Sequence, residues 1–277
     1  MQKVSNIIPY FRKELSSLFE EREVISWAYL SAEHLLGYSR SDCIIHADSN
    51  IDLQILNSLK QIVIDLKTKK PLQYILGETK FYGLKLKVNQ HTLIPRSETE
   101  EIVDWILKEK FQSALDIGTG SGCIAIALAK HSNAHISAID ISRDALQIAK
   151  ANANLNNVKL AFSEQDIFQT NRLEKVDLIV SNPPYVLNSQ QEHMDQNVLA
   201  YEPHLALFVS DNNPLVFYEK IIYLASKSLT SSGKLFFEIN EKFGDELIAI
   251  LIQNSFVDIE LKKDVNDKDR MIKAVWK

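Results

Sequence analysis

The chain has 277 residues, 45% hydrophobic and 24% charged, which is typical of a globular protein with one large or two small domains. A net charge of -5 at pH 7 argues against stable binding to nucleic acid, because proteins that coat nucleic acid present a basic face. No apolar run approaches the ~18 residues of a membrane span, and no signal peptide is recognisable. We therefore expect a cytoplasmic protein without a membrane partner.

The first part of the chain predicts a small helical bundle. Apolar residues recur at three- and four-residue steps from Ile7 to about Lys67, and no catalytic pattern accompanies them. We assign residues 1–70 to this bundle and expect it to have a structural or partner-docking role.

A β-hairpin is expected next. Lys69-Lys70-Pro71 ends the helical pattern, and residues 79–89 alternate apolar with polar side chains around Gly83. We assign residues 71–95 to a hairpin and linker that bridge two domains. Arg96 then precedes an acidic stretch and could pair with one of its carboxylates, while Ser97 or Thr99 is placed to cap a helix over Ile102–Lys110.

Residues 96–277 alternate strands with helices, which predicts an α/β domain with a mostly parallel sheet covered on both faces. The expected helices are Cys123–His131, Ser142–Asn154, Pro214–Ser228 and Asp245–Asn254. The expected strands are Ala114–Ile117, His135–Ile139, Lys159–Ser163, Leu178–Ser181, Lys234–Ile239, Val257–Lys262 and Met271–Trp276.

A glycine-rich segment follows the first of these strands. It reads Gly118-Thr119-Gly120-Ser121-Gly122, and alternate glycines allow a tight turn and the close approach of a ligand. A dinucleotide fingerprint would need glycine at position 123, where the chain has Cys123. The pattern therefore favours a nucleoside ligand without a pyrophosphate.

Acidic residues follow the next two strands. Asp140 can accept hydrogen bonds from two ribose hydroxyls, and Asp166 can meet the exocyclic amine of a base, with Ile167 in apolar contact with the ring. Each acid alone would more often be a helix cap or a turn residue. Their succession at strand ends favours an adenosine-like ligand, and S-adenosylmethionine fits the lack of a pyrophosphate site.

The fourth strand ends in Asn182-Pro183-Pro184-Tyr185. The prolines must stop the strand, and a side chain at the carboxyl end of a parallel strand faces the crevice where such sheets bind ligands. An ordinary strand-ending turn is the competing interpretation.

The order of these features resembles the class I methyltransferases. The resemblance implies a Rossmann-like seven-stranded sheet with an antiparallel final strand, here Met271–Trp276, and S-adenosylmethionine as the cofactor. The NPPY element narrows the resemblance to enzymes that methylate a planar NH2, which can be adenine N6 in DNA, guanine N2 in RNA or a glutamine side-chain amide. In such a site the Asn182 side-chain oxygen and the Pro183 carbonyl can each accept one N–H, and Tyr185 can pack on the flat group.

Further segments resemble the HemK-type peptide chain release factor glutamine methyltransferases. They are PLQYILG (71–77), FYGL (81–84), TLIPRSETE (92–100) and YEPHLAL (201–207), together with the glycine and NPPY segments. The resemblance implies methylation at N5 of the glutamine in the Gly-Gly-Gln loop of class I release factors. It also implies that Asn182, Pro183, Pro184 and Tyr185 form the catalytic segment, that Phe81 and Arg96 join them in binding the substrate, and that the cofactor lies against Gly118 to Gly122, Asp140, Asp166, Ile167 and Asn182.

Two other functions stay open from the sequence. One is a DNA adenine-N6 or other nucleic-acid amino-methyltransferase, which would need a basic target-recognition region. The other is a non-catalytic cofactor-binding adaptor of translation. Cys43 and Cys123 form no metal-binding pair, and the sequence suggests no metal site at His193 or His204, so no metal is expected. The polar stretch from Asn188 to Asn197 is expected to be a lid or a substrate contact.

Overall fold

The computed structural model describes residues 2–277, and Met1 and the side chain of His193 lie outside the described part. The chain divides into two compact units, Met1–Gly77 with Asp195–Tyr201 and Glu78–Met194 with Glu202–Lys277. Within the described residues, every helix is too short or too polar to cross a membrane.

The first unit is helical. After a short 3-10 turn at Val4–Asn6, its helices are α1 (Ile7–Leu15), α2 (Glu21–Leu36), α3 (Arg40–Ile45), α4 (Leu53–Lys67), α5 (Leu72–Leu76) and α9 (Gln196–Tyr201). Phe11, Leu15, Leu59 and Leu66 are fully buried where α1 packs on α2 and α4. The short helix α5 was not predicted, because proline at position 71 suggested only a break.

Helix α9 belongs to this unit although it lies far along the chain. The Tyr201 hydroxyl donates to the Thr68 carbonyl at 2.9 Å, and the Lys69 ammonium donates to the Gln196 side chain. The polar stretch from Asn188 to Asn197 therefore ends in the first residues of α9.

The second unit is built on a seven-stranded sheet with the order β10-β11-β9-β6-β3-β4-β5. Its strands are β3 (Ser113–Ile117), β4 (His135–Asp140), β5 (Ala161–Glu164), β6 (Val176–Ser181), β9 (Leu229–Glu238), β10 (Phe256–Lys263) and β11 (Asp269–Trp276). Strand β11 is antiparallel to both neighbours, whereas β9, β6, β3, β4 and β5 run parallel. The predicted α/β class, the seven strands and the antiparallel final strand are confirmed.

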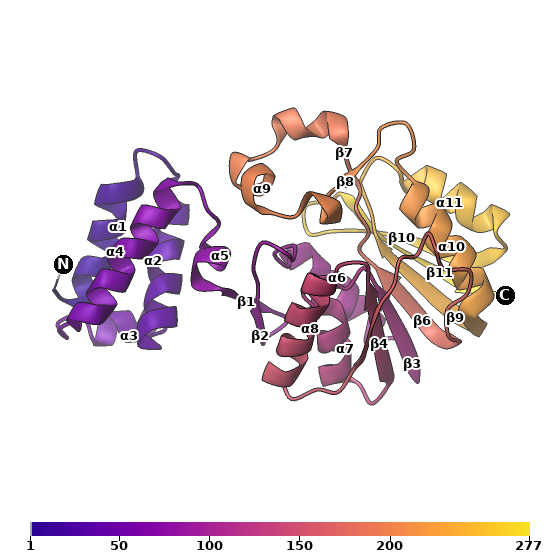
Figure 1. Cartoon of the computed structure of the whole chain (residues 1–277), viewed down its shortest axis with the longest axis horizontal. Coiled ribbons are helices and arrows are strands. Elements are labelled where there is room, and N and C mark those ends of the chain that lie inside the picture. Colours follow the sequence, from indigo (N-terminus) through magenta and orange to yellow (C-terminus); the bar gives the residue numbers. More distant parts are fainter. Residues whose placement is uncertain (1) are drawn as a thin grey trace. The chain divides into compact units, whose positions relative to one another are not determined.

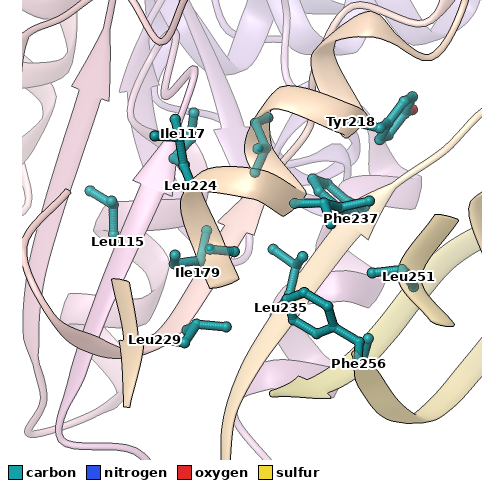
Figure 2. Close-up of a cluster of buried hydrophobic side chains, with 14 of the residues drawn as sticks. Leu115, Ile117, Ile179, Tyr218, Leu224, Leu229, Leu235, Phe237, Leu251 and Phe256 are labelled. Carbon is teal, nitrogen blue, oxygen red and sulfur yellow. The ribbon is translucent and has the colours of Figure 1, made fainter. Parts of the chain in front are cut away.

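Helices cover both faces of this sheet (Figure 1). Helices α6 (Ser97–Ile106), α7 (Cys123–His131) and α8 (Arg143–Leu155) pack on one face, and α10 (Val216–Ser228) and α11 (Gly244–Gln253) pack on the other. Figure 2 shows the second of these cores, where Leu224 of α10 and Leu251 of α11 lie with strand residues Ile179, Leu235 and Phe237. Burial on both faces explains why these strands read as apolar runs.

Two short ladders complete the second unit. The hairpin joins β1 (Glu78–Phe81) to β2 (Leu84–Lys87) through Tyr82 and Gly83, whose φ angles of 49° and 73° match the left-handed turn that a two-residue hairpin needs. Strand β7 (Val186–Leu187) pairs in parallel with β8 (Phe208–Val209). This pairing joins the two ends of the segment that follows NPPY.

The largest departures from the predicted bounds are in strand β9, which begins at Leu229 instead of Lys234, and in helix α6. Helix α6 begins at Ser97 and ends at Ile106, instead of covering Ile102–Lys110. Neither Ser97 nor Thr99 caps it, because Arg96 occupies the N-cap position and the Thr99 hydroxyl donates to Glu238 across the domain. A long-range hydrogen bond therefore replaces the expected local one.

Candidate active site

The site begins with the register of three parallel strands. Ile117 at the end of β3 pairs with Ser181 on β6 and with Ile139 on β4. Gly118 follows Ile117, Asn182 follows Ser181 and Asp140 follows Ile139. The glycine loop, the NPPY segment and the first acid therefore begin side by side at the same edge of the sheet. The strand order reverses between β3 and β6, and ligands bind at such switch points.

A cavity of about 360 Å³ opens at this edge, and all its walls belong to the second unit. Most of the predicted site residues line it. They are Arg96, Gly118, Thr119, Gly120, Ser121, Asp140, Asp166, Ile167, Asn182, Pro183 and Pro184.

The glycine loop is left-handed at alternate positions. Gly118, Gly120 and Gly122 have φ angles of 74°, 54° and 83°, which residues with a side chain rarely adopt. A Cβ on Gly118 or Gly120 would meet no atom within 4 Å, so the backbone here leaves space for a ligand. Gly122 differs, because its Cβ would lie 2.8 Å from Ile126 Cδ1 and 3.1 Å from Ala149 Cβ. It is needed for the packing of α7 against α8.

Asp140 holds the loop in place. Its carboxylate accepts the Gly120 N–H at 2.8 Å and the Ser142 N–H at 2.8 Å. Burial raises the pKa of Asp140, and these backbone donors oppose that rise. Because each carboxylate oxygen has a second lone pair, both can still accept a ligand hydroxyl.

A fully buried acid, Asp116, also contacts the loop. Asp116 accepts the Thr119 hydroxyl at 2.6 Å, while its Oδ1 has no hydrogen-bond partner among the described residues. Burial raises the pKa of Asp116 to about 7.

The apolar end of the cavity follows β5. Asp166 accepts the Phe168 N–H at 2.8 Å and so shapes the turn that places Ile167 on the wall. The Phe168 ring meets Phe217 of α10 edge-on at 5.3 Å between centroids. Phe217 also lines the cavity, and the sequence analysis missed it because a phenylalanine in a helix is usually a core residue.

The NPPY turn is fixed on either side of its first residues. The Ser181 hydroxyl donates to the Ile117 carbonyl at 2.7 Å, and Asn240 Nδ2 donates to the Tyr185 carbonyl at 3.0 Å. In contrast, the Asn182 carboxamide has no hydrogen-bond partner among the described residues, although it lines the cavity. It is free to bind a ligand.

Arg96 pairs with Glu202, whereas the sequence left open a pair with an acid of the first turn of α6. Its guanidinium donates to Glu202 Oε1 at 2.6 Å, and the Ile94 N–H donates to Glu202 Oε2 at 3.1 Å. The Glu202 side chain is 2% exposed, so the pair is shielded from water on one side. Glu202 therefore fixes the Ile94–Arg96 segment beside the cavity.

Three predicted site residues lie elsewhere. Phe81 is 1% exposed within the core beneath α6, Gly122 packs between helices, and Tyr185 turns its hydroxyl towards Glu238, so none of them lines the cavity. The predicted substrate contact of Phe81 gains no support from this position. Leu93 and Thr99, which flank Arg96 in sequence, line the cavity instead.

Asn152 is another residue that the sequence analysis missed. From α8 its Nδ2 donates to the carbonyls of Lys87 and Ser121, each at 2.9 Å, and its Oδ1 accepts the Lys87 N–H at 2.6 Å. One buried carboxamide thus joins the hairpin to the glycine loop. Its sequence context, between two alanines in a helix, carries no signal of this role.

The described part of the chain contains no group of three or more His, Cys, Asp or Glu side chains arranged to hold a metal ion. His204 packs edge-on against Phe208, and the His193 side chain lies outside the described residues.

Comparison with known proteins identifies the family. A family model described as the methyltransferase small domain matches residues 98–204, and one described as the PrmC N-terminal domain matches residues 10–77. The chain is 47% identical to a release factor glutamine methyltransferase of Flavobacterium psychrophilum, over 98% of each chain. It is 39% identical to one of Bacteroides thetaiotaomicron, over 98% of this chain and 99% of the other.

The chain belongs to the release factor glutamine methyltransferase family. It is therefore an S-adenosylmethionine-dependent methyltransferase, as the glycine loop and Asp140 predicted. A methyltransferase structure from Pyrococcus furiosus shares the fold, with a TM-score of 0.54 at 18% identity over 70% of this chain and 89% of that one.

The cavity fits S-adenosylmethionine. The space above Gly118 and Gly120 admits a ligand against the backbone, and Asp140 offers acceptors for ribose hydroxyls. Asp166, Ile167 and Phe217 supply a polar edge and apolar surfaces for a base.

Replacing two of the glycines should separate cofactor binding from packing. Gly118→Ala should lower the free energy of unfolding by only about 1–2 kcal/mol, the cost of a left-handed alanine, but weaken S-adenosylmethionine binding at least about tenfold because a methyl group enters the cavity. Gly122→Ala adds a clash with Ala149, so its loss of stability should exceed that of Gly118→Ala by about 1–3 kcal/mol. Urea denaturation and calorimetric titration would measure both effects, and equal stability losses would contradict the assignment of Gly122 to packing.

Proposed function

We propose that this protein transfers a methyl group from S-adenosylmethionine to N5 of the glutamine in the Gly-Gly-Gln motif of class I peptide chain release factors. The observation that carries the proposal is the Asn182 carboxamide, which is without a partner among the described residues and lies beside the glycine loop on one cavity wall. Family membership supports a release factor as the substrate.

The physical difficulty of the reaction is the weak nucleophile. The lone pair of an amide nitrogen is delocalised into its carbonyl group, so the nitrogen must be held and oriented. Asn182 Oδ1 and the Pro183 carbonyl each accept one of its N–H groups. The two hydrogen bonds fix the plane of the amide and favour a nitrogen lone pair that points into the cavity. Both acceptors are on one short turn, so the two contacts form together.

The cofactor would be held by the residues that line the cavity next to the NPPY turn. Asp140 accepts the ribose hydroxyls, Ile167 and Phe217 flank the base, and Gly118 and Gly120 let the ligand lie against the backbone. When bound, S-adenosylmethionine supplies an already activated methyl group, so alignment is the main task of the protein. Arg96 is engaged by Glu202 and shapes the acceptor side of the cavity.

No strong base is required in this proposal. Methyl transfer leaves the amide nitrogen positively charged and strongly acidic, so it loses one proton to water and becomes a neutral N-methylamide. Asp140 and Asp166 already accept backbone N–H groups and serve to position other atoms.

We further propose that the helical residues 1–70 dock the body of the release factor, with residues 71–95 as a bridging hairpin and linker and 96–277 as the methyltransferase domain. The compartment proposed is the cytoplasm, where release factors act, and stable binding to nucleic acid is not part of the function. The net charge of -5 fits a protein substrate better than a DNA substrate.

Methyl transfer from labelled cofactor is the test of the activity. Label should enter an unmethylated release factor at the Gly-Gly-Gln glutamine, and Asn182→Ala should lower kcat about 100-fold or more while cofactor affinity is largely retained. Asn212→Ala, on an exposed loop, is the matched control and should behave as the wild type. Label in DNA alone would support the nucleic-acid methyltransferase alternative. If Asn182→Ala left the function of the protein in cells intact, the non-catalytic adaptor of translation would be supported.

The docking role has a separate test. Removing residues 1–67 should raise KM for the whole release factor at least about tenfold, which corresponds to ~1.4 kcal/mol of lost contact, and leave KM for a short Gly-Gly-Gln peptide nearly unchanged. Cofactor affinity would verify that the shortened chain is folded. Equal effects on whole protein and peptide would argue against docking by the helical unit.

A further inference from the structure

Glu238 is a buried carboxylate that the proposed chemistry leaves unused. It is the last residue of β9, 1% exposed, and it lies outside the residues that line the cavity. A buried acid is costly unless it is hydrogen-bonded and its charge is compensated. Its partners therefore indicate what it does.

Both carboxylate oxygens accept a hydroxyl. Thr99 Oγ1 donates to Oε2 at 2.7 Å, and the Tyr185 hydroxyl donates to Oε1 at 3.0 Å. Burial and the neighbouring carboxylate raise the pKa of Tyr185 well above its usual value, so its hydroxyl keeps the proton that it donates. Thr99 and Tyr185 are far apart in sequence, and one side chain joins them.

The charge of Glu238 is compensated nearby. Burial raises its pKa, while the two hydroxyl donors and the positive charge of Arg270 lower it. Arg270 is itself held in place, since its Nε lies 3.2 Å from Asp264 Oδ2 and its Nη1 donates to the Ile239 carbonyl at 3.4 Å. These contacts favour the carboxylate form.

The strand register places Glu238 beside the reactive turn. Phe237 of β9 pairs with Ser181 of β6, so Glu238 is level with Asn182 on the neighbouring strand. Two residues later, Asn240 binds the Tyr185 carbonyl. The end of β9 therefore holds Tyr185 by its main chain and by its side chain.

The other partner of Glu238, Thr99, lines the cavity itself. This threonine lies in the first turn of α6. It follows the segment that the Arg96–Glu202 pair holds in place. Glu238 consequently links Tyr185 of the NPPY segment to Thr99, and it does so from outside the lining of the cavity.

We propose that Glu238 is a positioning residue for methyl transfer, which sets the spacing between the NPPY turn and the Arg96–Thr99 segment. The inference rests on the proposed function and adds a residue to it. Glu238 acts through Tyr185 and Thr99, so it governs the orientation of the methyl acceptor and leaves the cofactor side of the cavity unaffected.

Three variants test this role. Glu238→Gln keeps the shape, but its NH2 cannot accept, so one of the two hydroxyls loses its acceptor. Tyr185→Phe and Thr99→Val each remove one donor. Each variant should lower kcat for the release factor at least about tenfold, the effect of losing one hydrogen bond to a charged group, with cofactor affinity within about twofold of the wild type.

Asp177→Asn is the matched control. Asp177 is the second residue of β6, at the other end of the strand from NPPY, and its carboxylate accepts the Gln112 N–H at 2.9 Å and the Thr230 hydroxyl at 2.9 Å. This variant should lose stability, but kcat and the acceptor KM should stay at wild-type values.

The cycle of variants decides the inference. Tyr185→Phe should have a smaller effect in the Glu238→Gln background than in the wild type, because the bridge is already broken. Wild-type kcat in both Glu238→Gln and Tyr185→Phe would overturn the proposal, as would an equal loss in Asp177→Asn. If Glu238→Gln fails to bind cofactor and does not fold, Tyr185→Phe decides alone. Absence of transfer by the wild type would instead count against the proposed function.

Discussion

The register of β3 against its two neighbours is the constraint on which the site depends. Because Ile117 pairs with both Ser181 and Ile139, the residues that follow these three positions are level at the point where the strand order reverses. A shift of one residue on β6 would turn the Asn182 side chain to the other face of the sheet. The apolar cores on both faces hold that register, so packing remote from the cavity decides which groups meet there.

Buried and half-buried carboxylates hold the segments that line the cavity. Asp140 holds the glycine loop, Glu202 holds the Ile94–Arg96 segment, and Glu238 holds Thr99 and Tyr185. Each acid accepts two hydrogen bonds, which offset the loss of hydration on burial. The Asn182 carboxamide has no such partner among the described residues, and this contrast distinguishes the group that can bind a ligand from the groups that support it.

The sequence predicted the features that depend on local pattern. The alternation of strands and helices, the glycine loop and the strand-ending acids indicated the fold class and the cofactor, because each follows from periodicity or from backbone conformation. The sequence did not predict hydrogen bonds between residues that are far apart in the chain. Arg96 meets Glu202 and Thr99 meets Glu238 across 106 and 139 residues, whereas the sequence suggested only local roles, a possible ion pair for Arg96 and a helix cap for Ser97 or Thr99. Phe81 was expected near the substrate through resemblance alone, but it lies in the core.

The central claim is that the Asn182 side chain and the Pro183 carbonyl hold the amide of the substrate. A crystal structure of the protein with S-adenosylhomocysteine and a Gly-Gly-Gln peptide tests it most directly. If these two groups hold the amide, the glutamine side-chain nitrogen will lie within about 3.2 Å of both Asn182 Oδ1 and the Pro183 carbonyl oxygen. A glutamine amide bound elsewhere in the cavity, with Asn182 turned away from it, would contradict the account.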